Sequence, residues 1–264
     1  MPASRTRRIL AYAYGVLAYL LALATIGYAV GFLANVGVPR SVDVGPTAPA
    51  AEAAVVDLAL LGLFGLQHSV MARPWFKRRW KHLVPDPVER STYVVLASGA
   101  LAVLMWGWRP LPEVVWSVGG VLEPLLWAVY LGGWALMFAA VRMIDGDDLM
   151  GLRQVRAYRE GRDLEPLDFQ TPALYRYVRH PLVTGFLVAF WVTPTMSVGH
   201  LLFAGGMTAY ALVGVRLEER DLVAAFGDRY RRYRAAVPMF LPRPGRSFAA
   251  PPDVPAGDDV DGGR

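Results

Sequence analysis

Apolar residues recur along the 264-residue chain in stretches as long as membrane-spanning helices. A helix needs about 20 predominantly apolar residues to cross the hydrocarbon core of a bilayer. Polar and charged residues separate six such stretches, at roughly 9–33, 54–71, 93–108, 122–141, 182–194 and 199–217. The pattern predicts an all-α integral membrane protein with about five to six transmembrane helices.

The last two apolar stretches lie close together in the sequence, and the fifth is short. The fifth would form only about 20 Å of helix, and the segment "TPTMSVG" (193–199) has the proline, serine and glycine of a tight turn. We therefore expect a C-terminal helical hairpin that need not cross the bilayer fully. Because both ends of a hairpin lie at the same depth, Arg179 and His180 should face Glu218 and Glu219.

An amphipathic segment follows the hairpin. Leu222, Phe226, Tyr230 and Tyr233 recur at helical spacing and form one apolar face, while the arginines lie off it. The pattern predicts a basic amphipathic helix at 218–236 on the cytoplasmic membrane surface. After it, residues 244–264 are rich in Pro, Gly and Asp, which predicts a disordered tail. Residues 1–243 are then expected to form a single membrane-embedded domain.

The composition fits a membrane protein, with 55% hydrophobic and 19% charged residues and a mean hydropathy of +0.33. The net charge is +5, and the basic residues concentrate at the two ends of the chain and in alternate loops. Positive loops stay in the cytoplasm, so both termini should be cytoplasmic in a multi-pass protein of the inner (plasma) membrane. Topology accounts for the charge without a nucleic-acid partner. The chain has no cysteine, which excludes disulfides, thiolate metal sites and a cysteine nucleophile.

The hairpin ends supply the first candidate site. Pro181 suits the first position of a helix, where free N–H groups and the helix dipole attract anions. Arg179 and His180 add positive charge, and Glu218 and Glu219 would lie opposite. Adjacent anion-binding and cation-binding groups suit a zwitterionic ligand. The alternative is plain ion pairing at the membrane surface.

Two further groups of polar residues stand out. Asp145, Asp147 and Asp148 form an acidic cluster in an otherwise basic loop. They could bind a metal, for which this spacing is weak support, or they could end a solvated helix beside arginine partners. Gln67 and His68 lie late in an apolar stretch, where polar groups are costly and often functional. His68 could equally be a hydrogen-bonded core histidine.

Two C-terminal segments, "RHPLVTG" (179–185) and "LEERDLVAAFGDRYRRYRAAVPMFLP" (217–242), resemble the signature of the isoprenylcysteine carboxyl methyltransferase superfamily. These are membrane enzymes that use S-adenosylmethionine. The segments "LQHSVMARPWFK" (66–77) and "GLRQV" (151–155), among others, resemble the methanethiol S-methyltransferases, bacterial enzymes that make dimethyl sulfide and are close to the NnrU family. The resemblance runs from about residue 8 to 243. Two places depart from the pattern: Val183 stands in place of a tyrosine, and in 145–151 Gly146, Asp147 and Met150 stand in place of a histidine and two aromatic residues.

The resemblance implies S-adenosylmethionine as cofactor, a small thiol as substrate and a lipid bilayer as partner, with no metal. Carried over by position, it implies cofactor contacts from Arg179, His180, Pro181, Gly185, Glu218, Glu219, Tyr230, Tyr233 and Gln154. The positions near the departures, Asp145, Asp148 and Val183, would contact the substrate. A free thiol has a pKa of about 8.5 and reacts as thiolate, so a base would help. The candidates are His180, Glu219 and His68.

Two rival functions stay open at this point. The chain could methylate another lipophilic acceptor, such as a carboxylate or a hydroxyl, since no feature of the sequence excludes one. It could also be an NnrU-like accessory membrane protein that keeps the fold without turnover. The sequence does not fix the oligomeric state.

Overall fold

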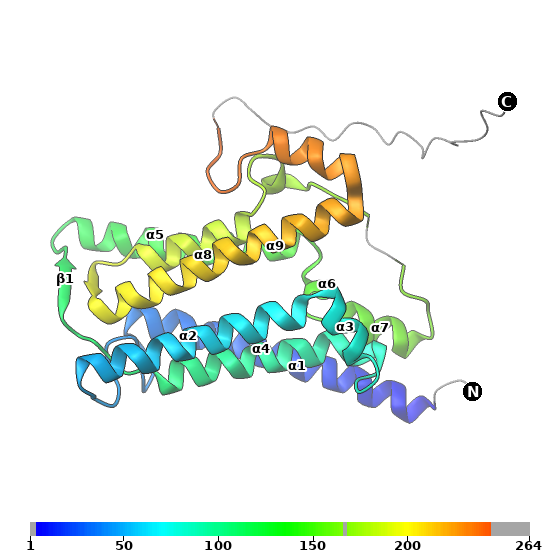
Figure 1. Cartoon of the computed structure of the whole chain (residues 1–264), viewed down its shortest axis with the longest axis horizontal. Helices are drawn as coiled ribbons and strands as arrows, with labels where there is room; N and C mark the ends of the chain where they lie inside the picture. The colour runs from blue at the N-terminus through cyan, green and yellow to red at the C-terminus, as the bar shows by residue number, and fades with distance from the viewer. Residues whose placement is uncertain (1–3, 166–167, 244–264) are drawn as a thin grey trace.

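Long apolar helices dominate the computed structural model, which describes residues 4–165 and 168–243 (Figure 1). Five are long and apolar enough to cross a membrane: α1 (Arg5–Ala34), α2 (Ala50–Ala72), α4 (Asp86–Gly107), α5 (Leu122–Met143) and α9 (Val198–Ala236). The helix α8 (Pro181–Trp191) is apolar but shorter. The predicted all-α membrane architecture is therefore confirmed. The helices α1, α2 and α4 begin earlier than the apolar stretches that predicted them, and α9 ends later.

Short elements occupy both ends of the molecule. At one end, β1 (Val114–Ser117) pairs antiparallel with β2 (Thr195–Ser197), the turn between α8 and α9. At the other end lie α3 (Pro74–Trp80), α6 (Gly146–Leu149), α7 (Leu152–Glu160) and the 3-10 helix η1 (Ala173–Arg176) (Figure 1). The strand pair fixes the hairpin turn to a distant loop. The hairpin's open end is thereby directed to the opposite end of the molecule.

The long helices form two groups, with α1, α2 and α4 in one and α5, α8 and α9 in the other (Figure 1). Aromatic side chains join the groups: Phe32 of α1 lies 6.2 Å from the ring of Trp108 and 5.8 Å from that of Phe203 on α9, measured between centroids. Such pairs contribute about 0.5–1.5 kcal/mol beyond the area they bury. They hold α9, which carries the candidate glutamates, against α1.

Small residues allow α5 and α8 to approach closely. A Cβ atom on Gly185 would lie 2.6 Å from the carbonyl oxygen of Gly133 and 2.7 Å from the backbone nitrogen of Met137. Helices pack through small residues in membranes because the lipid itself supplies no hydrophobic driving force between them. Gly185 is therefore a packing residue at a helix crossing, and its expected contact with a cofactor stays a prediction.

The last helix differs from the prediction. α9 runs continuously past the expected boundary at residue 218 and bends instead at Gly227, whose φ of 54° and ψ of −130° are non-helical. The segment beyond the bend folds back over the end of the bundle (Figure 1). Two tyrosines of its apolar face are covered by the protein: Tyr230 and Tyr233 are 2% and 3% exposed and pack against Phe169. The predicted tail, 244–264, lies outside the described residues.

Candidate functional site

The open end of the α8–α9 hairpin gathers the charged residues expected there. His180 is the N-cap of α8 and Pro181 its first residue, where the missing proline N–H costs no helical hydrogen bond. Glu218 and Glu219 lie on α9, which returns antiparallel to α8. The turn at 192–197 thus brings residues some 40 positions apart into contact.

Glu219 is the centre of a buried ion-pair cluster. Its Oε1 accepts a hydrogen bond from Arg179 Nε at 2.7 Å and lies 3.1 Å from His180 Nε2. The side chains of Arg179 and Glu219 are only 9% and 8% exposed. Removing one partner from such a buried pair leaves an uncompensated charge. The cluster therefore fixes the start of α8 to α9.

Arg179 also holds the end of the chain that follows α9. Its Nη1 donates to the carbonyl oxygens of Arg234 (2.9 Å) and Val237. The backbone N–H groups of Arg179 and His180 donate to Pro238 and Met239 at 2.9 and 3.1 Å. These N–H groups of Arg179 bind other parts of the protein. In this structure Arg179 is therefore a positioning residue. A direct contact between Arg179 and a ligand stays a prediction.

Glu218 differs sharply from its neighbour. Successive helical residues point about 100° apart, so Glu218 leaves the buried cluster, and its side chain is 57% exposed. Within residues 4–165 and 168–243 its ion-pair contact is a long one, 3.8 Å to His180 Nδ1. Glu218 is thus the carboxylate of the hairpin that remains available to a hydroxyl or a cation.

Tyrosines close this end from the side of η1. The hydroxyl of Tyr233 donates to the carbonyl oxygen of Tyr175 at 2.6 Å. Burial raises the pKa of Tyr175, and the negative charge of Glu218 raises it further, so its hydroxyl stays a neutral donor near that carboxylate. Tyr175 was missed from the sequence, although it lies just before Arg179.

A salt bridge also secures the segment before η1. Asp168 accepts hydrogen bonds from the backbone N–H of Phe169 at 2.7 Å and from Arg229 Nη1 at 2.8 Å. Both contacts lower the pKa of Asp168, and the hydrogen bond from Phe169 has the larger effect. They hold Phe169 against the tyrosines of α9.

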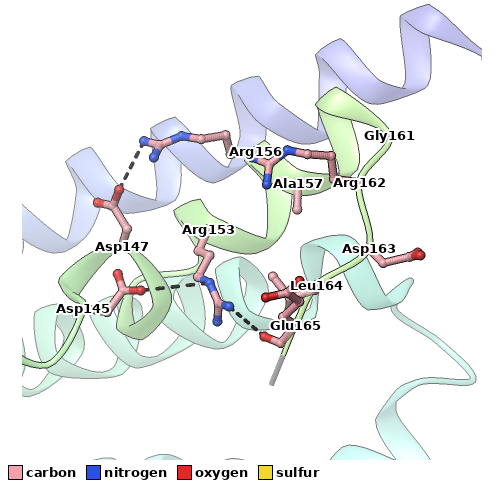
Figure 2. Close-up of a pocket in the computed structure, with 10 residues that line it drawn as sticks. All are labelled: Asp145, Asp147, Arg153, Arg156, Ala157, Gly161, Arg162, Asp163, Leu164 and Glu165. Atoms are coloured by element: carbon pink, nitrogen blue, oxygen red, sulfur yellow. Dashed lines mark hydrogen bonds and ion pairs between the residues drawn. The ribbon is translucent and has the colours of Figure 1, made fainter. Parts of the chain in front are cut away.

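The acidic cluster of the 145–148 loop is paired with arginines of α7 (Figure 2). Asp147 lies 3.1 Å from Arg156, and Asp148 and Asp145 lie 3.1 and 4.0 Å from Arg153. Across residues 4–165 and 168–243 no three His, Asp or Glu side chains are grouped to hold a metal ion. The aspartates therefore match the alternative interpretation of a helix end with arginine partners.

A charged cavity of about 670 Å³ lies beside these pairs (Figure 2). Its lining comprises Asp145, Asp147, Arg153, Arg156, Ala157, Gly161, Arg162, Asp163, Leu164 and Glu165. None of the hairpin residues lines it. A small apolar substrate would gain little in such a cavity, because ligand pockets of that kind are mostly apolar.

Gln154 contacts the acidic cluster, and the charge of Asp148 acts on Lys77. Gln154 Nε2 donates to Asp148 Oδ1 at 3.0 Å, whereas its Oε1 is buried and has no hydrogen-bond partner among the described residues. Burial is the main cause that lowers the pKa of Lys77, and the charge of Arg90 lowers it further, while the carboxylates of Glu89 and Asp148 oppose the shift. Lys77 was not singled out from the sequence, because one lysine in a basic loop gives no signal.

His68 lies in an aromatic group between α2, α4 and α9. Its ring centroid is 5.5 Å from that of Phe64, 5.2 Å from Tyr93 and 6.0 Å from Tyr210. His68 Nδ1 is buried, and the described part of the chain offers it no hydrogen-bond partner. The ring is packed among these aromatic side chains, and its role as a base stays a prediction.

An ion pair ties this end of α2 to the hairpin. Arg73, just beyond α2, lies 2.9 Å from Asp221, which is one helical turn beyond Glu218 on α9. His68 and Glu218 thus approach the same end of the molecule from different helices. Val183 is partly buried on α8, near its first turn.

Comparison with known proteins matches residues 58–241 to the model of the NnrU protein family. A methanethiol S-methyltransferase of Mycobacterium tuberculosis is 51% identical over 91% of this chain and 99% of its own length. Methanethiol S-methyltransferases 2 and 1 of Bradyrhizobium diazoefficiens are 49% and 47% identical, over 87% and 90% of this chain and 89% and 84% of theirs. No solved structure matches.

Proposed function

Because the chain belongs to the NnrU family and is about half identical to methanethiol S-methyltransferases over nearly its whole length, we propose that it is a methyltransferase acting on methanethiol. The donor in this proposal is S-adenosylmethionine and the product is dimethyl sulfide. The observation that carries it is the difference between the two hairpin glutamates: Glu219 is buried in ion pairs, whereas Glu218 is largely exposed and has a long contact of 3.8 Å to His180.

The residues present suit S-adenosylmethionine. That molecule has an ammonium, a carboxylate, a ribose diol and an adenine, so its site needs hydrogen-bond acceptors as well as donors. Among the buried polar atoms that have no partner in the described residues, two are amide oxygens that could meet this need: Gln67 Oε1 and Gln154 Oε1. Unsatisfied buried groups are rare and call for an explanation. Glu218 would accept from the ribose or the ammonium, and Tyr175 would donate from the opposite side.

The protein's own part in the reaction is alignment and proton removal. When bound, S-adenosylmethionine would supply an electrophilic methyl group on a sulfonium for transfer to the thiol sulfur, with S-adenosylhomocysteine as the leaving group. The chain has to place that sulfur, exclude water and accept the thiol proton. His68 is the best-placed base, because its Nδ1 is free, whereas both ring nitrogens of His180 face carboxylates. His180 and Glu219 act as positioning residues, and the rings around His68 suit a small apolar thiol.

We further propose a multi-pass inner-membrane protein whose two termini lie in the cytoplasm. Arginines and lysines gather at the end of the bundle that carries α3, α7 and the hairpin opening (Figure 1), and positive loops stay cytoplasmic. The reaction would then take place at the cytoplasmic membrane face. A volatile thiol that dissolves in lipid could reach the site from the bilayer.

Headspace gas chromatography tests the proposal. Purified protein in detergent receives S-adenosylmethionine and methanethiol, and Glu218→Gln is compared with Glu52→Gln. The control makes the same chemical change at an exposed residue in the first turn of α2. We expect dimethyl sulfide from the wild type and from Glu52→Gln, and little from Glu218→Gln.

The rival functions give different results in the same experiment. S-adenosylhomocysteine formed only with a lipophilic carboxylate or hydroxyl would mean a methyltransferase with another acceptor. Folded protein without turnover on any acceptor would favour a non-catalytic accessory protein.

A further inference from the structure

Arginines from two distant parts of the chain surround a second cavity, of about 400 Å³. Its lining comprises Arg5, Arg8 and Ile9 from the first turns of α1, and Arg159 from the end of α7. The catalytic proposal uses none of these residues. The cavity therefore needs an explanation of its own.

The positive charge of this cavity is poorly compensated by the protein. Among residues 4–165 and 168–243, no acidic side chain lies within ion-pair distance of Arg5 or Arg8, and Arg8 Nε is buried without a hydrogen-bond partner. The ion pair between Arg159 and Glu160 is long, 3.9 Å, and Glu160 is shared with Arg162. A buried guanidinium nitrogen without an acceptor is costly, so the cavity is suited to an anion.

The arginines are held in place by the packing of α1 on α7. A Cβ atom on Gly15 would lie 2.5 Å from Val155 Cγ2, which shows how closely the two helices approach. The guanidinium of Arg159 lies 4.0 Å above the ring of Tyr12. The cavity is thus a fixed feature between two packed helices.

The surface beside the cavity is apolar. Ile9 and Leu10 are 51% and 63% exposed at the start of a helix that is long and apolar enough to span the membrane. A ligand here meets a phosphate-binding group of arginines on one side and a lipid-facing surface on the other. Guanidinium groups bind phosphate oxygens in pairs, with a geometry that lysine lacks.

We propose that this cavity binds the phosphate of an anionic phospholipid, with the acyl chains lying along Ile9 and Leu10. Inorganic phosphate has the same anionic group but no acyl chains, and it would leave the apolar surface unused. Basic residues beside a membrane attract anionic lipids, and here they also enclose a defined cavity. The bound lipid would join the N-terminal end of α1 to the C-terminal end of α7.

Native mass spectrometry of the full chain in detergent tests this inference. Phosphatidylglycerol and phosphatidylcholine are titrated against wild type, the double variant Arg5→Gln/Arg8→Gln and the control Arg7→Gln/Arg78→Gln. The control removes the same charge from exposed arginines that do not line the cavity. An arginine near an anionic lipid surface contributes about fivefold in affinity. We expect wild type to prefer phosphatidylglycerol, the cavity variant to bind it about 25-fold more weakly, and the control to match wild type.

Three results would overturn the inference. Equal losses in both double variants would mean general charge attraction, and equal binding of both lipids by wild type would mean no anion site. Displacement of the lipid by millimolar inorganic phosphate would assign the cavity to a soluble anion. If the thermal transition shows that the cavity variant does not fold, Arg159→Gln is tested in its place. We expect Arg159→Gln to lose the preference for phosphatidylglycerol over phosphatidylcholine.

Discussion

The substitution Glu219→Gln removes the charge at the centre of the hairpin cluster while keeping the shape of the side chain. Glu219 accepts from Arg179 at 2.7 Å and lies 3.1 Å from His180, and hydrogen bonds to charged groups contribute about 1.5–3 kcal/mol each. Breaking a buried ion pair costs about 3–5 kcal/mol. Glutamine retains one acceptor oxygen, so we expect the free energy of unfolding to fall by about 3 kcal/mol.

A double-mutant cycle with Arg179→Gln separates the pair from its surroundings. Because the pair is already broken in either single variant, the double variant should lose about 2 kcal/mol less than the sum of the singles. Reversible unfolding in mixed detergent micelles measures each value, and Glu218→Gln, an isosteric change at the exposed neighbour, should leave stability nearly unchanged. A loss below about 0.5 kcal/mol for Glu219→Gln, or strict additivity in the cycle, would refute the reasoning.

Three further predictions address packing, catalysis and pH. Gly185→Ala should lower the free energy of unfolding by about 1–3 kcal/mol, because the added methyl group forces α5 and α8 apart. Gly205→Ala should not lower it, because a Cβ there meets nothing within 4 Å. Thermal unfolding of the two variants tests this. His68→Ala should reduce turnover at least tenfold with S-adenosylhomocysteine affinity changed little, as calorimetry and product assays would show; normal turnover would remove His68 as base. The lowered pKa of Asp168 stabilises the fold above the ordinary carboxyl range, and this contribution is lost as the pH falls through the lowered value. The thermal midpoint of Asp168→Asn should therefore depend less on acidification than that of the wild type, and parallel curves would contradict this.

The hairpin could be predicted from the sequence because its signals are local. A short apolar stretch, a turn segment and a second apolar stretch imply that the two flanks lie at one depth. The contact between Arg179 and Glu219 follows from that geometry alone. The aromatic face of 222–233 was also recognised by its spacing, although its partner, Phe169, was not.

Other features depend on contacts that no local pattern records. Which of Glu218 and Glu219 points inward is set by the rotation of α9 against its neighbours, and the packing role of Gly185 requires Gly133 on a different helix. The pairing of β1 with β2 joins segments about 80 residues apart. The apolar spacing continues as a helix past residue 218, where the sequence predicted a boundary between two helices. The bend lies nine residues later, at Gly227.

The central claim is methyl transfer from S-adenosylmethionine to methanethiol at the hairpin site. The most direct test supplies donor whose methyl group carries three deuterium atoms, with unlabelled methanethiol, to purified wild type and to Glu218→Gln. The account predicts dimethyl sulfide that is three mass units heavier from the wild type and almost none from the variant. Unlabelled dimethyl sulfide, or equal labelled product from both proteins, would contradict it.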